Sequence, residues 1–132
     1  VEGVECREVS IDIPIIGSVT VLEATADSQE TLVNMALTLD DDDDIQSDKR
    51  LNAGDPYGAV LWPSASAIAT RLLLDNGDET NASENPLKGV SILEIGAGTG
   101  LVSIAASLGG ATKVIATDYE SVPLRLLHYA AD

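Results

Sequence analysis

Three glycines at alternate positions form the chemically most informative part of the sequence. Gly96, Gly98 and Gly100 lie in SILEIGAGTGLVSIAASL, residues 91–108, between an apolar run and a run of small and aliphatic residues. Glycines at such a place let the backbone turn tightly and approach a ligand closely. The start of a helix after them offers unpaired N–H groups and a partial positive charge. The pattern predicts a ligand-binding loop between a strand and a helix.

Two carboxylates flank this loop in the sequence. Asp118 stands 20 residues after Gly98 and closes a second apolar run, where a carboxylate can accept hydrogen bonds from both hydroxyls of a ribose. Glu94 stands two residues before Gly96. A carboxylate there would repel a pyrophosphate, but it suits a ligand that carries an ammonium and a sulfonium. Together the two acids indicate an adenosyl-type ligand with positive charge.

The glycine spacing separates two such ligands. The dinucleotide fingerprint G-x-G-x-x-G would need a glycine at position 101, where this sequence has Leu101. The observed G-x-G-x-G, together with Glu94, favours S-adenosylmethionine, whose single carboxylate the helix start can receive. A glycine turn without any ligand and a fragment of an NAD-binding oxidoreductase stay as alternatives.

The elements around the loop follow from the hydrophobic pattern. Residues 90–95 and 113–118 predict two parallel strands buried on both faces, and residues 101–108 predict the helix between them. Leu61, Ile68, Leu72 and Leu73 recur at helical spacing, and a helix is expected from Pro63 or Ser64 to Asn76-Gly77. The sequence thus predicts a complete β-α-β unit with a helix before it.

The first 39 residues indicate a different structure. REVSIDIPI and SVTVLEA alternate at period two and predict a hairpin around a Gly17-Ser18 turn. TLVNMALTL, residues 31–39, fits both the helical and the strand period, and the marginal stability of a lone hairpin favours a third strand.

Residues 40–56 include five consecutive aspartates and predict an acidic loop, because like charges repel. No metal site is expected, since the spacing of a calcium loop is absent.

Charge and cysteine content narrow the class of protein. The 132 residues are enough for one domain, and their net charge is −15. Residues 1–89 hold 18 acidic and 5 basic side chains, whereas residues 90–132 hold 4 and 2. This acidity disfavours nucleic acid and membranes as direct partners. The single cysteine, Cys6, fits a reducing compartment, so we expect a cytoplasmic or nuclear location.

These motifs carry a resemblance. VSILEIGAGTGLVSIAASLGGATKVIATDY resembles motif I and the following acidic motif of class I, seven-β-strand methyltransferases, which use S-adenosylmethionine. With GAVLWPSASAIATRLL ahead of it, the segment from Tyr57 to the C-terminus is similar to the methyltransferase-like family that contains many protein-lysine methyltransferases. The resemblance implies an S-adenosylmethionine-dependent methyltransferase that acts on a lysine of a protein substrate.

The resemblance also implies roles for single residues. Gly96, Ala97 and Gly98 would line the methionine end of the cofactor, Asp118 would hold the ribose, and Glu94 would help to orient the amino group. By itself Trp62 reads equally well as a core aromatic, and only the resemblance places it near the cofactor. No residue is expected as catalytic base. The expected cofactor-binding residues are Trp62, Glu94, Gly96, Ala97, Gly98, Gly100 and Asp118.

The expected fold class is α/β: an incomplete Rossmann-like doubly wound sheet, represented by its first β-α-β unit, after an N-terminal hairpin or small antiparallel sheet and a helix. The expected division is a β extension at 1–39, an acidic loop at 40–56, and at 57–132 the N-terminal half of a methyltransferase domain. The substrate-side Asp-x-x-Tyr motif of the family does not occur, so the chain alone is expected to be inactive. A non-catalytic adenosyl-binding or interaction module is the alternative function, and the oligomeric state is open.

Overall fold

The computed structural model describes residues 3–40, 57–76 and 85–131. The expected acidic loop lies outside these residues except for Asp40. The described part is an antiparallel strand pair, a parallel strand pair and four helices, which confirms the predicted partial Rossmann-like α/β class. In chain order the elements are β1 (Cys6–Ile13), β2 (Gly17–Ala24), α1 (Ala26–Asp40), α3 (Pro63–Asn76), β3 (Ser91–Ile95), α4 (Leu101–Leu108), β4 (Lys113–Thr117) and α5 (Ser121–Ala131).

The predicted hairpin is confirmed, with its turn shifted. β1 and β2 pair antiparallel, and the register joins Arg7 to Glu23 and Ile13 to Gly17. The turn occupies residues 14–16, so Gly17 is already the first residue of β2 rather than part of the turn. Val19, Val21 and Glu23 alternate along β2 and are all buried, because this face of the hairpin packs on the core.

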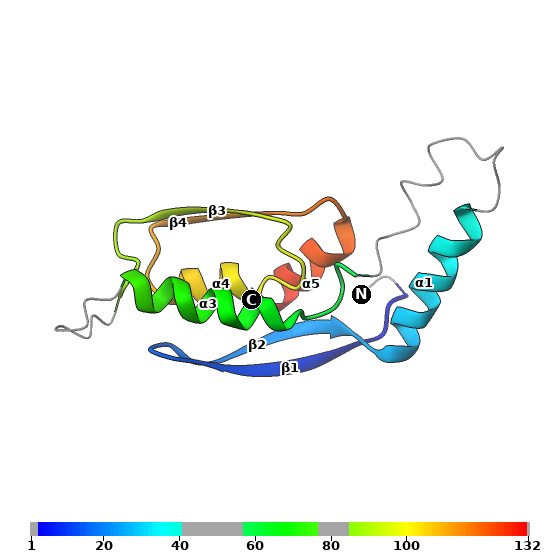
Figure 1. The fold of residues 1–132 in the computed structure, drawn as a ribbon, viewed down its shortest axis with the longest axis horizontal. Coiled ribbons are helices and arrows are strands. Elements are labelled where there is room, and N and C mark those ends of the chain that lie inside the picture. Colours follow the sequence, from blue (N-terminus) through cyan, green and yellow to red (C-terminus); the bar gives the residue numbers. More distant parts are fainter. Residues whose placement is uncertain (1–2, 41–56, 77–84, 132) are drawn as a thin grey trace.

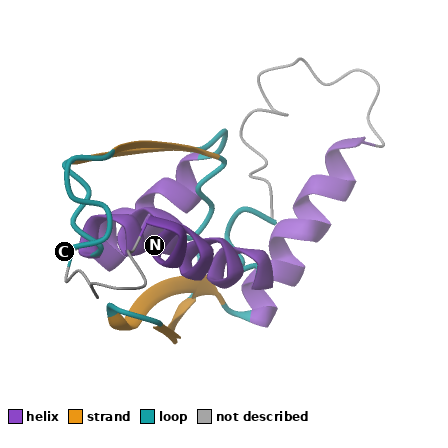
Figure 2. Ribbon diagram, turned by 60° about the vertical axis from the view of Figure 1, so that its left-hand side comes forward, coloured by secondary structure: helices purple, strands orange, loops and turns teal. Residues whose placement is uncertain are grey.

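The preference for a third strand at residues 31–39 was wrong. These residues belong to α1, which extends away from the other elements (Figures 1 and 2). The helix begins where the Gln29 N–H donates to the Thr25 carbonyl at 2.9 Å, and the Gln29 side chain donates to the Ala24 carbonyl at 2.7 Å. The segment contains no glycine or proline and is rich in good helix formers, and these local preferences decide between the two periods.

The predicted β-α-β unit is present. β3 and β4 pair in parallel, with Ser91 opposite Lys113 and Ile95 opposite Thr117. α3 begins at Pro63, as expected, since a proline suits the first position of a helix. Figure 1 shows α3, α4 and α5 lying between the β3–β4 pair and the hairpin, so they cover only one face of that pair.

The expectation that both strands are buried on both faces was therefore wrong. Leu93, Ile95 and Ile115 are 61%, 82% and 43% exposed, whereas Ile92, Glu94 and Val114 point to the covered face and are half-buried. Among the described residues, Figures 1 and 2 show no helix or strand over the other face of the β3–β4 pair. A single crossover connection can cover one face of a two-stranded sheet, and the apolar residues of the other face stay in contact with water.

The core is centred on α4. Leu101, Val102, Ala105 and Ala106 of this helix are buried together with Val19 and Val21 of the hairpin and Ala69 and Leu73 of α3. Small alanines on α4 let its neighbours approach closely, which suits a helix packed between two layers. Within the described ranges, no helix is long and apolar enough to cross a membrane.

Candidate functional site

The glycine loop has a backbone that other residues rarely adopt. Gly96, Gly98 and Gly100 have φ values of 74°, 53° and 83°, in the left-handed region where a Cβ atom is strained. The N–H groups of Gly96 and Ala97 both donate to the Thr117 carbonyl at 2.9 Å. The start of the loop, which follows β3, is therefore held against the carboxyl end of β4. The positive φ values explain why glycine stands at all three alternate positions.

The three glycines serve different neighbours. A Cβ at Gly96 would have no atom within 4 Å, so this side of the loop is open to a ligand. A Cβ at Gly98 would lie 3.5 Å from the Gly58 carbonyl oxygen, which places the segment before α3 directly beside the loop. A Cβ at Gly100 would collide with the Leu127 side chain of α5, and Gly100 is buried. Packing of α5 thus explains Gly100 without a ligand.

Asp118 lies where the sequence placed it, at the end of β4, and contacts the loop. Its Oδ2 accepts the Gly98 N–H at 2.8 Å, and its Oδ1 accepts the Glu120 N–H at 3.0 Å. Each carboxylate oxygen has a second lone pair, so the group can accept ribose hydroxyls in addition. Asp118 is both a candidate ligand contact and a support of the loop.

Glu94 faces α4 from the covered side of β3. Its Oε2 accepts a hydrogen bond from the Ser103 hydroxyl, and Ser103 is buried. Burial raises the pKa of Glu94 above its ordinary value of 4.5; the Ser103 hydrogen bonds oppose that shift, and the negative charge of Asp118 adds to it. Sequence reasoning missed Ser103, although it is one of only two polar residues in α4 and was a usable signal.

Trp62 is not a buried core aromatic. Its side chain is 52% exposed, its Nε1–H donates to the Tyr57 carbonyl at 2.9 Å, and its ring centroid lies 6.3 Å from that of Tyr57. Tyr57 is 60% exposed. Both residues belong to the segment of residues 57–62, and the Gly58 carbonyl of this segment lies beside Gly98. The position suits a contact with a ligand in the loop, and that role of Trp62 stays a prediction.

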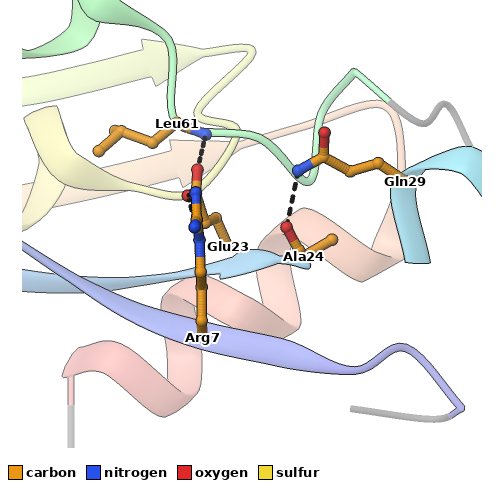
Figure 3. Close-up of polar contacts among 5 residues, drawn as sticks. All are labelled: Arg7, Glu23, Ala24, Gln29 and Leu61. Atoms are coloured by element: carbon orange, nitrogen blue, oxygen red, sulfur yellow. Dashed lines mark hydrogen bonds and ion pairs between the residues drawn. The ribbon is translucent and has the colours of Figure 1, made fainter. Parts of the chain in front are cut away.

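Two hydrogen bonds attach this segment to the hairpin. The Ala24 N–H donates to the Ala59 carbonyl at 2.9 Å. The Leu61 N–H donates to Glu23 Oε2 at 3.0 Å (Figure 3). Arg7 donates to the other oxygen of Glu23. Sequence reasoning missed both charged residues because a turn at Gly17-Ser18 does not pair them. A turn centred on Ile15 places Arg7 and Glu23 at equal distances from it, which was the signal available.

Tyr119 is a further residue that the sequence reading did not use. It follows Asp118 directly and is 81% exposed. An exposed aromatic ring next to a candidate ribose contact offers a surface on which a base can stack. The group of candidate residues therefore combines carboxylates, open backbone and exposed rings at one edge of the parallel strands.

The residues fit a cationic adenosyl ligand better than an anionic one. The Gly96 side of the loop leaves room against the backbone, and both nearby side-chain charges, Glu94 and Asp118, are acidic. A pyrophosphate would meet two negative charges, whereas an ammonium and a sulfonium would be attracted by them. Its place at the carboxyl end of parallel strands is the one at which Rossmann-like folds commonly bind an adenosyl group, and for this chain such binding stays a prediction.

Comparison with known proteins places the chain in a family. The family described as "Lysine methyltransferase" matches residues 40–130. The chain is 53% identical over 70 residues to the protein-lysine methyltransferase METTL21E of Bos taurus, a match that covers 52% of this chain and 22% of that protein. It is 38% identical over 68 residues to the human electron transfer flavoprotein beta subunit lysine methyltransferase, covering 52% and 23%.

The chain belongs to the lysine methyltransferase family, as the resemblance in its motifs predicted. Methyltransferases of this class use S-adenosylmethionine in general. The matches span about a quarter of the length of these relatives. The assignment of single cofactor-binding residues and the division of the chain into segments stay predictions.

Proposed function

We propose that this chain binds S-adenosylmethionine at the loop of residues 96–100 and thereby provides the cofactor site of a protein-lysine methyltransferase. The observation that carries the proposal is the hydrogen bond from the Gly98 N–H to Asp118, which brings the open glycine backbone and the candidate ribose contact together. Glu94 adds a second negative charge near Asp118. Family membership supports the same function.

Bound S-adenosylmethionine would supply a methyl group that its sulfonium already activates. The residues of this chain would bind and orient it. Asp118 would accept the ribose hydroxyls, Glu94 would attract the amino group, and the exposed rings of Trp62 and Tyr57 would border the ligand. No described residue is assigned as catalytic base, and the chain by itself is proposed to bind cofactor without transferring methyl groups.

The proposed methyl acceptor is a lysine in a basic segment of another protein. The relatives named above are protein-lysine methyltransferases by their names, which supports the acceptor class. The net charge of −15 on this chain supports a basic segment around the lysine of the substrate protein, because an acidic surface attracts basic peptides and repels nucleic acid. We propose neither nucleic acid nor a membrane as direct partner.

Titration calorimetry of the 132-residue chain with S-adenosylhomocysteine, and with NAD as the comparison ligand, tests the cofactor proposal. We expect binding of the first and none of the second. S-adenosylhomocysteine keeps the ammonium, the carboxylate and the ribose, so it reports on the proposed contacts. Binding of NAD alone, or of neither ligand by a folded sample, would contradict the proposed site.

A further inference from the structure

The ion pair between Arg7 and Glu23 joins the two strands of the hairpin, and Glu23 also accepts a hydrogen bond from Leu61, which lies outside the hairpin. Arg7 and Glu23 face each other in the β1–β2 register, on the side of the hairpin that packs on the core. The Arg7 Nε and Nη2 atoms donate to Glu23 Oε1 at 2.8 and 2.6 Å. The Glu23 side chain is 7% exposed, whereas that of Arg7 is 65% exposed. Arg7 therefore balances the charge of a carboxylate that is buried in the protein.

The two carboxylate oxygens of Glu23 bind two different parts of the chain. Oε1 accepts both Arg7 hydrogen bonds from β1, and Oε2 accepts the Leu61 N–H at 3.0 Å (Figure 3). A side-chain amide has only one acceptor oxygen, so only a carboxylate can accept on both sides. Glu23 is thus chemically suited to link the hairpin to the segment of residues 57–62.

That segment continues directly to the candidate cofactor site. The Gly58 carbonyl lies against Gly98, and Trp62 follows the residue that Glu23 binds. The Ala24 N–H holds the Ala59 carbonyl one residue further along β2, and Ala59 is 1% exposed. A connection therefore runs from Arg7 through Glu23 to Leu61 by hydrogen bonds, and from Leu61 along the backbone to Gly58, which lies beside the glycine loop.

We propose that Arg7 and Glu23 are positioning residues for the cofactor site: they hold residues 57–62 against the glycine loop, so that the rings of Tyr57 and Trp62 border the site before a ligand binds. The part of this proposal that concerns the ligand rests on the proposed function. Pre-organisation of this kind raises affinity, because the protein does not spend binding free energy on ordering the segment. A pair that only stabilised the hairpin would have no such effect.

The substitution Glu23→Gln tests the proposal with a side chain of nearly the same shape. The amide can accept from Arg7 or from Leu61, but not from both, and it places its N–H groups against the other donor. Arg7→Met is the second variant, since it leaves the Glu23 carboxylate buried without its cation.

Val19→Ala is the matched stability control, because it truncates a buried side chain of β2 nearer the turn. Asp75→Asn, which breaks the exposed Arg71–Asp75 pair, is the matched charge control.

Two readouts separate positioning from stability. Trp62 is the only tryptophan of the chain, so acrylamide quenching of its fluorescence in the ligand-free protein reports on residues 57–62 alone. Calorimetric affinity for S-adenosylhomocysteine reports on the site, and the melting temperature reports on stability. All measurements are made well below the lowest melting temperature, so that every variant is folded.

We expect Glu23→Gln and Arg7→Met to raise the quenching constant of Trp62 and to weaken S-adenosylhomocysteine binding about tenfold or more, the effect of losing a hydrogen bond to a charged group. Val19→Ala should lower the melting temperature and change neither readout, and Asp75→Asn should change none of the three. Unchanged quenching in both Arg7 and Glu23 variants would overturn the proposal, as would equal quenching changes in Val19→Ala. A parent chain that binds no S-adenosylhomocysteine would contradict the proposed function, while quenching would still decide the positioning role.

Discussion

Asp118, the candidate ribose contact, also supports the glycine loop, which its sequence position did not reveal. From the sequence, Asp118→Ala is expected to remove a ligand contact with little loss of folding. The hydrogen bonds from the Gly98 and Glu120 N–H groups change that expectation. We now predict that Asp118→Ala abolishes S-adenosylhomocysteine binding and also lowers the free energy of unfolding by about 1–2 kcal/mol, because two backbone donors lose their acceptor.

Urea unfolding of the ligand-free chain measures the stability part of this prediction. Asp118→Asn keeps one acceptor oxygen and should lose less stability than Asp118→Ala. Asp12→Ala is the control, since it removes an exposed carboxylate of β1. If Asp118→Ala unfolds at the same urea concentration as the parent, the carboxylate does not support the loop.

The raised pKa of Glu94 predicts opposite pH trends for binding and stability. Burial favours the protonated form in the folded state, so the charged form opposes folding, and the free energy of unfolding falls as the pH rises from 4.5 through the raised pKa. The ammonium of the ligand favours the carboxylate, so affinity rises over the same range. Glu94→Gln should keep an acceptor for Ser103 and remove the contribution of Glu94 to both trends.

Calorimetry with S-adenosylhomocysteine and urea unfolding at a series of pH values check this. The difference between parent and Glu94→Gln isolates Glu94 from the other carboxylates. If the parent and Glu94→Gln have the same affinity at every pH, Glu94 does not face the ligand's ammonium. The same follows if the contribution of Glu94 to affinity falls with rising pH, as its contribution to stability does.

At the scale of elements, the glycine loop joins two functions, and two alanine substitutions separate them. Gly100→Ala places a Cβ in the Leu127 side chain and should lower the free energy of unfolding by about 2–4 kcal/mol, from backbone strain and displacement of α5. Gly96→Ala meets no neighbour, so only its φ of 74° is strained and about 1–2 kcal/mol is lost. Its main effect should be on the ligand.

Urea unfolding and calorimetry of the two variants, at a temperature where both are folded, test this division. Per unit of stability lost, Gly96→Ala should weaken S-adenosylhomocysteine binding far more than Gly100→Ala does. The reverse order would show that the open side of the loop is not where the ligand binds.

The sequence predicted those elements whose hydrophobic period and boundary residues indicate the same type of element. β3, α4 and β4 were foreseen because two short apolar runs with a glycine turn and a small-residue segment between them fit a β-α-β unit, although the sequence did not show that one face of the strands is exposed. α1 was missed because residues 31–39 fit two periods, and the assumption that a hairpin needs a third strand outweighed local helix preference. The Arg7–Glu23–Leu61 connection was missed because a shift of the turn by two or three residues changes every cross-strand pair.

At the scale of the whole molecule, two structural units form the candidate site together. The β-α-β unit supplies the glycine loop, Glu94 and Asp118, which sequence motifs identify. The hairpin contributes no motif, yet its Glu23 holds the segment that carries Trp62. Membership in the lysine methyltransferase family accounts for the first unit, while the second became visible only through contacts between residues far apart in the sequence.

The central position of α4 has a consequence for how the molecule unfolds. This one helix packs against the hairpin on one side and against β3 and β4 on the other, and its buried residues belong to a single core cluster with both α3 and β2. Separating either layer would expose part of the same helix to water and weaken the shared core, so the two layers stabilise each other through α4. The hairpin and the parallel strands should therefore lose their structure in one cooperative transition, although they share no strand pairing.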